Sequence, residues 1–415
     1  MAATAGNPDA DLSDSAACRD SGCVANPIVA FELTWHGRTS DIPKWLWDAC
    51  FGPPQEGLFW FRALEAGRLE QQFAFLFGLL QQDGVAVGII PAFLHDLSLD
   101  LVIPPAIARF VQPLARGPLR RLGYQRTLFV GNVAGEEGHI GLVPGHTLRA
   151  SAPFIQSALR KKARALKAAM LVWKDFPSEV REALDEGLVT GGAFRIPSYP
   201  STIIPLVRGG YAAFLATQRS DRRRKINSKL RRSANTYTVT TGVVARPDED
   251  QLGEIFTLFH QTYLRGKTKF ERLTPEYFHA IAECDESTFI VQRDSMSGKM
   301  VAFMLMLNLG QRIINQFIGI DYGATSGGFP HFRLFAAAYD WACATPATVM
   351  QSGQTGYMAK LDMGHALVPL WNYCEHRNPA VNWIYRKGAA GIAWETLDDQ
   401  LAEYLKAHPE AREFV

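Results

Sequence analysis

The cations between residues 222 and 232 form the clearest chemical pattern in the sequence. A helix turns by about 100° per residue, so one stripe of it carries a row of positive charge made by Arg222, Lys225, Lys229 and Arg232. Such a row suits phosphate groups, either of a nucleotide-like cofactor or of RNA. The alternative is a charged face that only meets solvent, although no acidic residue within 222–232 pairs with these cations.

A second candidate is the glycine-rich stretch at 319–333, where a predicted strand ends and a helix begins at Pro330. Unpaired backbone N–H groups at the start of a helix bind anions such as a pyrophosphate. Gly327 and Gly328 let the chain approach a ligand closely, or they only permit a turn.

Two further segments carry polar groups in loops. Gln354, Tyr357 and Lys360 follow a short strand with glycines between them, which is typical of the wall of a binding site. Lys360 suits a carboxylate or phosphate as a point charge. His260 and Tyr263 lie near the end of a predicted helix that runs into a basic loop with Lys267, and the alternative is a structural role.

These segments need a scaffold of mixed strands and helices. In the first half we expect a hairpin at 73–80 and 85–93, strands at 126–132 and 171–175, and a basic helix at 153–166. Glycines and prolines at 190–201 mark a boundary. In the second half the pattern predicts strands at 202–207, 238–245, 288–294, 300–309, 312–320, 349–352 and 383–386, with helices at 211–219, 222–237, 248–264, 330–344 and 397–406.

Composition limits the function classes. A chain of 415 residues suggests two or three domains, at roughly 100–200 residues each. The net charge of +2 argues against general nucleic-acid binding, so any basic surface must be local. The six cysteines form no CxxC pair and no zinc-finger spacing, so we expect no metal. With no run of about 18 apolar residues and no secretory signal, the expected location is the cytoplasm, without a membrane span.

Several segments together resemble GNAT-type N-acyltransferases related to the Fem family, in the branch named for peptidoglycan biosynthesis or recognition. The resemblance covers roughly residues 35–390 and rests on six segments: FWFRALE (59–65), IIPAFL (89–94), RKINSKLRR (224–232), LFHQTY with its basic loop (258–269), GFPHFR (328–333) and QSGQTGYMAKLDMG (351–364).

The resemblance implies an α/β (α+β) fold of tandem GNAT-like lobes, each a mixed, mainly antiparallel sheet flanked by helices. The implied organisation is a disordered tail at 1–27, an N-terminal lobe at 28–200, a C-terminal acyltransferase lobe at 201–390 and a terminal helix at 391–415. In such lobes the two strands expected at 312–320 and 349–352 splay apart to admit the acyl donor.

The expected activity is transfer of an acyl group from acyl-CoA, such as acetyl-CoA, to the amine of a small molecule or peptide. The expected cofactor-binding residues are Arg224, Lys225, Lys229, Arg232, Gly327, Gly328 and Arg333. The expected substrate-binding residues are His260, Tyr263, Lys267, Gln354 and Lys360. The catalytic candidates are Tyr322 and Tyr357, which would protonate the leaving thiolate, and His331, which with Asp321 is a candidate base.

One departure keeps other functions open. The GNAT pyrophosphate loop reads Gln/Arg-x-x-Gly-x-Gly/Ala, whereas residues 321–328 here read DYGATSGG. Fem-type members take activated amino acids from tRNA instead of using such a loop. The alternatives are therefore an aminoacyl-tRNA-dependent transferase, in which the cations at 222–232 bind RNA, and a binding protein with the fold but no catalysis.

Overall fold

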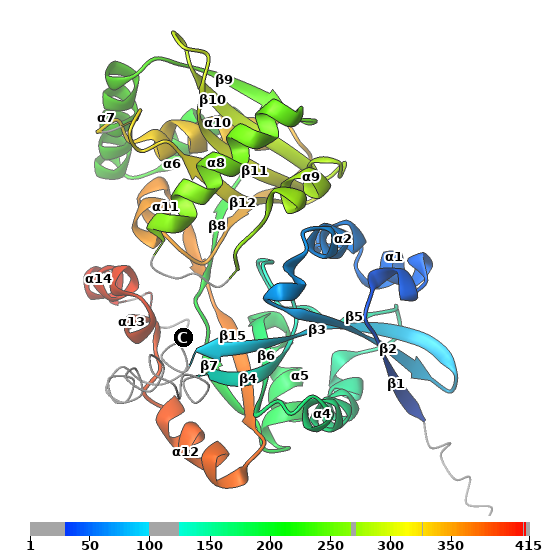
Figure 1. The fold of residues 1–415 in the computed structure, drawn as a ribbon. Helices are drawn as coiled ribbons and strands as arrows, with labels where there is room; N and C mark the ends of the chain where they lie inside the picture. The colour runs from blue at the N-terminus through cyan, green and yellow to red at the C-terminus, as the bar shows by residue number, and fades with distance from the viewer. Residues whose placement is uncertain (1–29, 99–123, 267–270, 326, 410, 412–415) are drawn as a thin grey trace, which may run out of the picture.

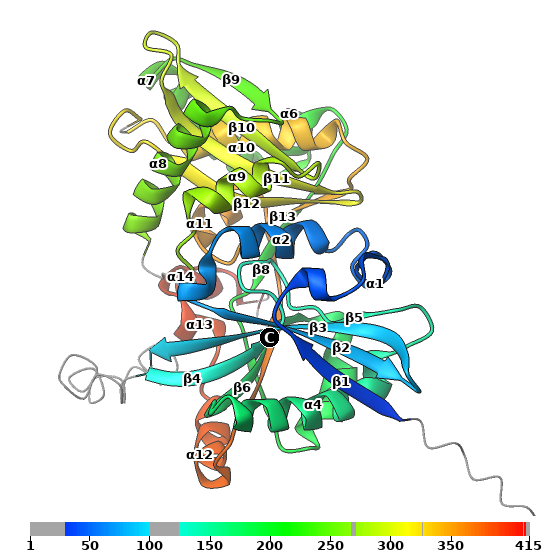
Figure 2. The same ribbon diagram turned by 45° about the vertical axis from the view of Figure 1, so that its right-hand side comes forward.

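The structure is a computed structural model that describes residues 30–98, 124–266, 271–325, 327–409 and 411. The tail expected at 1–27 and the site candidate Lys267 lie outside the described residues. Two sheets lie one above the other, each covered by helices on both faces (Figures 1 and 2). We call the first sheet with its helices the first lobe, and the second sheet with its helices the second lobe.

The first sheet is mainly antiparallel, with parallel pairing between β4 and β6. Its strands in spatial order are β1 (Phe31–His36), β2 (Ala74–Gln82), β3 (Val85–Ser98), β4 (Tyr124–Val130), β6 (Met170–Pro177), β15 (Leu370–His376) and β7 (Phe194–Pro197), with β5 (Gly141–Leu142) paired to β3. The predicted hairpin is confirmed as β2 and β3. Its arms are apolar throughout because helices cover both faces of this sheet.

The second sheet is antiparallel except where β12 meets β13. Its strands in spatial order are β14 (Ala366–Val368), β8 (Ser201–Pro205), β13 (Val349–Ser352), β12 (Arg312–Ile320), β11 (Met300–Leu309), β10 (Ser287–Asp294) and β9 (Val239–Val244). The predicted strands from 288 to 320 and at 349–352 are confirmed, and the expected fold class is observed in both lobes.

The helices described are α1 (Lys44–Cys50), α2 (Leu58–Ala66), α4 (Leu148–Ala165), α5 (Arg181–Leu184), α6 (Gly210–Thr217), α7 (Ser220–Thr236), α8 (Glu249–Arg265), α9 (Pro275–Ala282), α10 (Pro330–Cys343), α11 (Tyr357–Met363), α12 (Pro379–Ala389), α13 (Trp394–Leu397) and α14 (Asp399–Ala407). One apolar core joins the lobes, since α1 and α2 share it with α8 and α9. At its centre the rings of Trp60 and Tyr277 meet edge to face, with centroids 6.0 Å apart. This core holds the facing surfaces of the two lobes together.

The structure corrects the sequence interpretation in three places. Residues 383–386 lie in helix α12 and not in a strand, because Asn378 caps the helix and Pro379 fills its first turn. Residues 357–363, expected as loop, form α11 between Gly356 and Gly364, which both have positive φ. β15 and α12 lie on the first sheet, so the division that assigned 201–390 to one lobe does not follow the sheets.

Candidate active site between the two lobes

The strands β12 and β13 pair only over a short length. Their parallel register runs from Arg312–Val349 to Asn315–Ser352, after which β13 ends and the chain turns toward α11. β12 continues to Ile320 with β11 on its other side. Among the described residues, β12 therefore has no β13 partner beyond Asn315, at the place where an acyl donor is expected to enter in this fold. The register of β12 also shifts at Gln316, and such bulges re-aim side chains next to active sites.

A polar cluster of buried and half-buried side chains lies where the lobes meet at this point. We call it the interlobe cluster, and it consists of Glu56, Glu136, Glu137, Ser201, Arg312, Gln351 and Lys360. The three glutamates come from the first lobe, mostly from the loop that follows β4. Arg312 on β12, Gln351 on β13 and Lys360 on α11 come from the second lobe. The cluster is thus assembled only when the lobes pack together.

Arg312 is the central link of the interlobe cluster. Its Nη1 donates to Glu137 Oε2 at 3.2 Å and to Gln351 Oε1 at 2.8 Å. Its Nη2 lies 3.5 Å from Glu56 Oε2, and its Nε and Nη2 donate to the carbonyl of Pro54. Burial raises the pKa of Glu56, but contacts with His139, Arg312 and the N–H of Glu136 hold it at about 2. Glu56 is therefore a buried anion that needs these partners.

Glu136 and Lys360 form the titratable part of the cluster. Glu136 Oε2 accepts from Ser201 Oγ at 3.3 Å, and Lys360 Nζ donates to the carbonyl of Gly353 at 2.5 Å. Burial raises the pKa of Glu136 while the charge of Lys360 opposes this, and burial lowers the pKa of Lys360. A carboxyl group and an amine shifted toward each other's range are suited to moving protons near neutral pH.

Gly353 lies directly beside this pair. A Cβ at this position would lie 3.3 Å from Glu136 Oε1 and 3.9 Å from Lys360 Nζ. Two buried polar atoms nearby, Asn132 Nδ2 and Gln316 Oε1, have no hydrogen-bond partner among the described residues, although Gln316 Nε2 donates to Ala134 at 2.7 Å. Buried polar atoms without a hydrogen-bond partner are rare in folded proteins, and they are often found where a protein binds a ligand or performs catalysis.

A second polar group adjoins the cluster on the first lobe. Asp175 on β6 is buried, and it accepts from both Lys174 and Ser198. Its φ of 60° is unusual for a residue other than glycine and is typical of functional sites. Glu271, from the second lobe, interacts electrostatically with Lys174, and burial raises its pKa to about 7 against that opposing charge. This group extends the polar surface along the junction.

The two segments predicted to bind phosphate are adjacent in the structure. Lys229 lies 4.4 Å from the ring centre of Phe332, and Arg232 lies 5.2 Å from that of Phe329, where α10 begins. Lys225 and Lys229 also pair with Asp362 of α11, at 2.6 and 2.7 Å. No acidic residue between 222 and 232 pairs with these cations, and Asp362 of α11 takes this role. The two ion pairs connect α7 to α11, the helix that carries Lys360.

The remaining residues predicted around α10 are partly structural. Arg333 donates to the carbonyl of Tyr237, and Gly328 packs under the Tyr237 ring. Gly327 is exposed with a φ of 73°, and Arg224 is exposed on α7. Burial, reinforced by Lys229, lowers the pKa of His331 to about 4, so this imidazole is neutral at pH 7.

The other candidates lie in two places. Gln354 joins Lys360 at the interlobe cluster, where its Nε2 donates to the Glu136 carbonyl at 3.4 Å. Tyr357 is fully buried and donates to the carbonyl of Pro200, and burial raises its pKa far above the usual range. His260 and Tyr263 stack on each other near the end of α8, close to Arg265, whose guanidinium lies 4.3 Å from the ring centre of Tyr322.

The sequence interpretation included Gln351 among the polar residues after the short strand, but it did not single out Glu56, Glu136, Glu137, Ser201, Arg312 or Asp175. A signal for two of them was present, because residues 131–138 place consecutive glutamates among three glycines directly after a buried strand. The sequence around Arg312 contains no such signal, because an arginine at the start of a strand usually lies on the protein surface. Within the described ranges, no group of three or more His, Cys, Asp or Glu could hold a metal ion. The helices described there include none long and apolar enough to cross a membrane.

Comparison with known proteins defines the class of fold. No protein-family model matches the chain, and no curated protein matches it. Among solved structures, FemX is similar with a TM-score of 0.55 and 12% identity, covering 85% of this chain and 100% of FemX. A conserved protein of unknown function from Bacteroides thetaiotaomicron has a TM-score of 0.51 and 12% identity, over 83% and 99% of the two chains.

A tandem GNAT protein from the clavulanic acid biosynthesis pathway has a TM-score of 0.49 and 12% identity, over 84% of this chain and 99% of that one. At these identities the likeness concerns the fold alone. The fold is the tandem GNAT-like arrangement that the sequence predicted.

Proposed function

We propose that this protein is an N-acyltransferase that moves an acyl group from acyl-CoA to an amine by direct attack. The observation that carries the proposal is the end of the pairing between β12 and β13 directly beside the buried Glu136 and the half-buried Lys360. A gap between strands admits an extended acyl donor, and a proton-accepting group next to it suits an amine nucleophile.

The donor would lie along the second lobe. Its phosphates would meet Lys229 and Arg232 and the start of α10, which has no side-chain cap. Its carbonyl would lie beside β12 after Asn315, where the strand has no partner on the β13 side among the residues described. Backbone N–H groups on that side would stabilise the oxyanion.

The acceptor amine would enter from the interlobe cluster. Glu136 would take a proton from the ammonium form, and the free amine would then attack the thioester carbon. The new C–N bond forms, the C–S bond breaks, and the thiolate takes up a proton. The acylated nitrogen releases its second proton, which restores the group that protonated the thiolate. Of the two tyrosines expected to protonate the thiolate, we retain Tyr322, which follows β12 directly and is partly exposed, because the Tyr357 hydroxyl is held at Pro200.

The test is calorimetric binding of acetyl-CoA, followed by an assay of thiol release with a panel of amines. Binding should weaken about tenfold or more in Arg232→Gln, since a charged hydrogen bond is lost, and should be unchanged in the control Lys161→Gln on α4. No heat of binding at about 1 mM donor would reject the proposal.

The exposed Arg224 and Arg231 on α7 favour a second candidate, an aminoacyl-tRNA-dependent transferase. The same preparation would then bind aminoacyl-tRNA with a steep salt dependence, would not bind acetyl-CoA, and would lose its activity on treatment with ribonuclease. These three readouts separate the two donors.

A further inference from the structure

Helix α12 presents large apolar side chains to solvent. It has no buried residue, and Trp383 and Ile384 are 60% and 58% exposed. They are consecutive, and no other exposed large hydrophobic residues among those described are neighbours in sequence. The opposite side of the helix is held to the first lobe, because Asn382 and Arg386 donate to the carbonyl of Gly192. The apolar pair therefore faces outward on a well-anchored helix.

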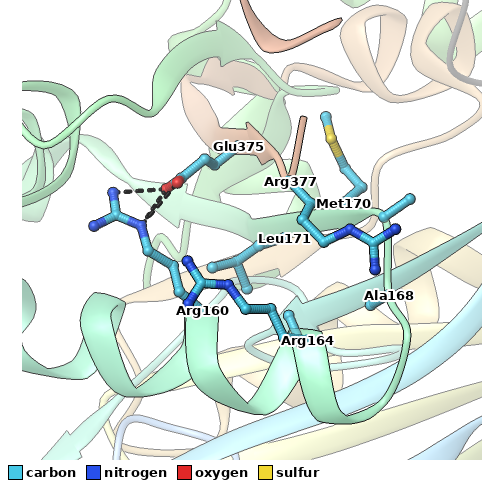
Figure 3. Close-up of a pocket in the computed structure, with 9 residues that line it drawn as sticks. Arg160, Arg164, Ala168, Met170, Leu171, Glu375 and Arg377 are labelled. Carbon is cyan, nitrogen blue, oxygen red and sulfur yellow. Dashed lines mark hydrogen bonds and ion pairs between the residues drawn. The ribbon is translucent and has the colours of Figure 1, made fainter. Parts of the chain in front are cut away.

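A cationic pocket lies at the foot of this helix (Figure 3). It encloses about 50 Å³ between the end of α4 and the ends of β6 and β15. Met170 and Leu171 form part of its lining, and Arg160 pairs there with Glu375 at 2.7 Å. Arg164 and Arg377 also line it, and neither has an ion-pair partner within the described ranges. Two guanidinium groups are thus left to meet an anion.

The pocket and the exposed face belong to one surface. Arg377 directly precedes Asn378, which caps α12, and its N–H donates to Ala169 at 2.8 Å beside the pocket. Arg160 donates to Gly191, in the turn whose next residue holds α12. In both views α4 and α12 lie at the end of the first lobe that faces away from the second lobe (Figures 1 and 2).

The arrangement of charge and apolar surface identifies the partner. Favourable interaction of cations with the C-terminal end of α4 accounts for Arg164 but not for Arg377, nor for an outward tryptophan and isoleucine. Aromatic and aliphatic side chains flanked by Lys and Arg are the features of helices that lie in the headgroup region of a bilayer. Lys387, next to Arg386, adds a further cation on α12.

We propose that α12 docks this protein on an anionic phospholipid surface, with Trp383 and Ile384 among the headgroups and with lipid phosphates at the exposed guanidinium groups of Arg164 and Arg377, which border the pocket on different sides (Figure 3). This is peripheral attachment and needs no spanning helix. It goes beyond the proposed acyl transfer and does not depend on it.

The experiment is co-sedimentation of the full chain with vesicles of phosphatidylglycerol and phosphatidylcholine, compared with phosphatidylcholine alone. We expect binding only to the anionic vesicles, falling as salt rises. The double variant W383S/I384S should bind at least about tenfold more weakly. Each of Arg164→Gln and Arg377→Gln should cost about fivefold. The matched controls are Trp45→Ser, another exposed tryptophan, and Arg208→Gln, an exposed arginine of the second lobe; both should bind like the unchanged protein.

Three results would overturn the proposal. The first is no retention on anionic vesicles. The second is retention that these substitutions leave unchanged while circular dichroism shows a normal fold. The third is binding of tRNA that depends on Arg164 and Arg377, without vesicle binding, which would assign this surface to RNA. Competition of inorganic phosphate with vesicle binding tests the pocket itself. If phosphate competes fully in Arg164→Gln and Arg377→Gln as well, the pocket is not the phosphate site.

Discussion

Replacing Arg312 by methionine should destabilise the junction between the lobes. The side chain is only 12% exposed and serves two carboxylates, Glu137 at 3.2 Å and Glu56 at 3.5 Å. Methionine has a similar length but leaves Glu56, which is fully buried, without the cation that helps hold its pKa at about 2. Removing one partner of a buried ion pair costs about 3–5 kcal/mol, because the other charge remains buried.

The size of this effect can be checked by denaturation. For a cooperative unit of lobe size, about 3–5 kcal/mol corresponds to a fall in Tm of about 6–20 °C. Urea unfolding of R312M should show a lower free energy of unfolding. Adding Glu137→Gln in the same chain should recover part of the loss, since one unpaired charge is then removed, and the double-mutant cycle measures the coupling.

The matched control is the pair of Arg126 and Asp96, which has a similar distance of 2.9 Å but lies on the surface. Arg126→Met should cost at most about 1 kcal/mol, as exposed pairs do. If R312M costs no more than this control, the interlobe cluster is not a desolvated network, and the account of the site given above is refuted.

Three further predictions concern Glu136, Gly353 and His365, the last of which is buried between Ser352 Oγ and the Lys360 carbonyl, at 3.1 and 3.0 Å. Glu136→Gln should lower acyl transfer about 10²–10⁴-fold. Because burial raises the Glu136 pKa, the wild-type rate should also fall as pH drops through that raised value; Glu179→Gln, on the surface, is the control for both. Gly353→Ala would place a methyl group 3.3 Å from Glu136 Oε1, so this carboxylate should shift and the pH dependence of acyl transfer should change, whereas an unchanged pH profile would contradict this contact. His365, whose pKa burial lowers to about 3, should reduce stability by up to about 1.4 kcal/mol per pH unit as pH falls from about 6.5, because only the unfolded state takes up the proton. Denaturation at several pH values should show a shallower slope in His365→Gln, and an equal slope would contradict the assignment.

Local patterns were sufficient to predict most of the second lobe. Strands at 300–309 and 312–320 were predicted at their observed bounds, because apolar runs bounded by turn residues are unambiguous there. The failures have local causes too. Residues 383–386 contain a tryptophan, an isoleucine and a tyrosine, which favour a strand. These residues form a helix instead, because Asn378 caps its N-terminus and Pro379 suits its first turn.

The candidate site was only partly predictable because its members are far apart in the chain. Lys360 could be singled out from its own segment, since glycines and polar residues surround it. Glu136 lies more than 200 residues earlier, and nothing near Lys360 indicates that a carboxylate will be buried beside it. The sheet order determines this pairing, which local periodicity does not contain.

The two-lobed architecture has a physical reason in the charges of the junction. Neither lobe alone could bury its share of the interlobe cluster, because Glu56 would lose Arg312, Glu136 would lose Lys360, and both cations would lose these anions. Burying unpaired charges is costly, so each lobe exposes a polar surface that only the other lobe can satisfy. The apolar contact between α2 and α9 supplies the association, and the polar cluster fixes its geometry. The pKa shifts of these groups therefore depend on the packing of the two lobes against each other. Substitutions at the α2–α9 contact should change the pKa of Glu136, although the substituted residues do not contact Glu136.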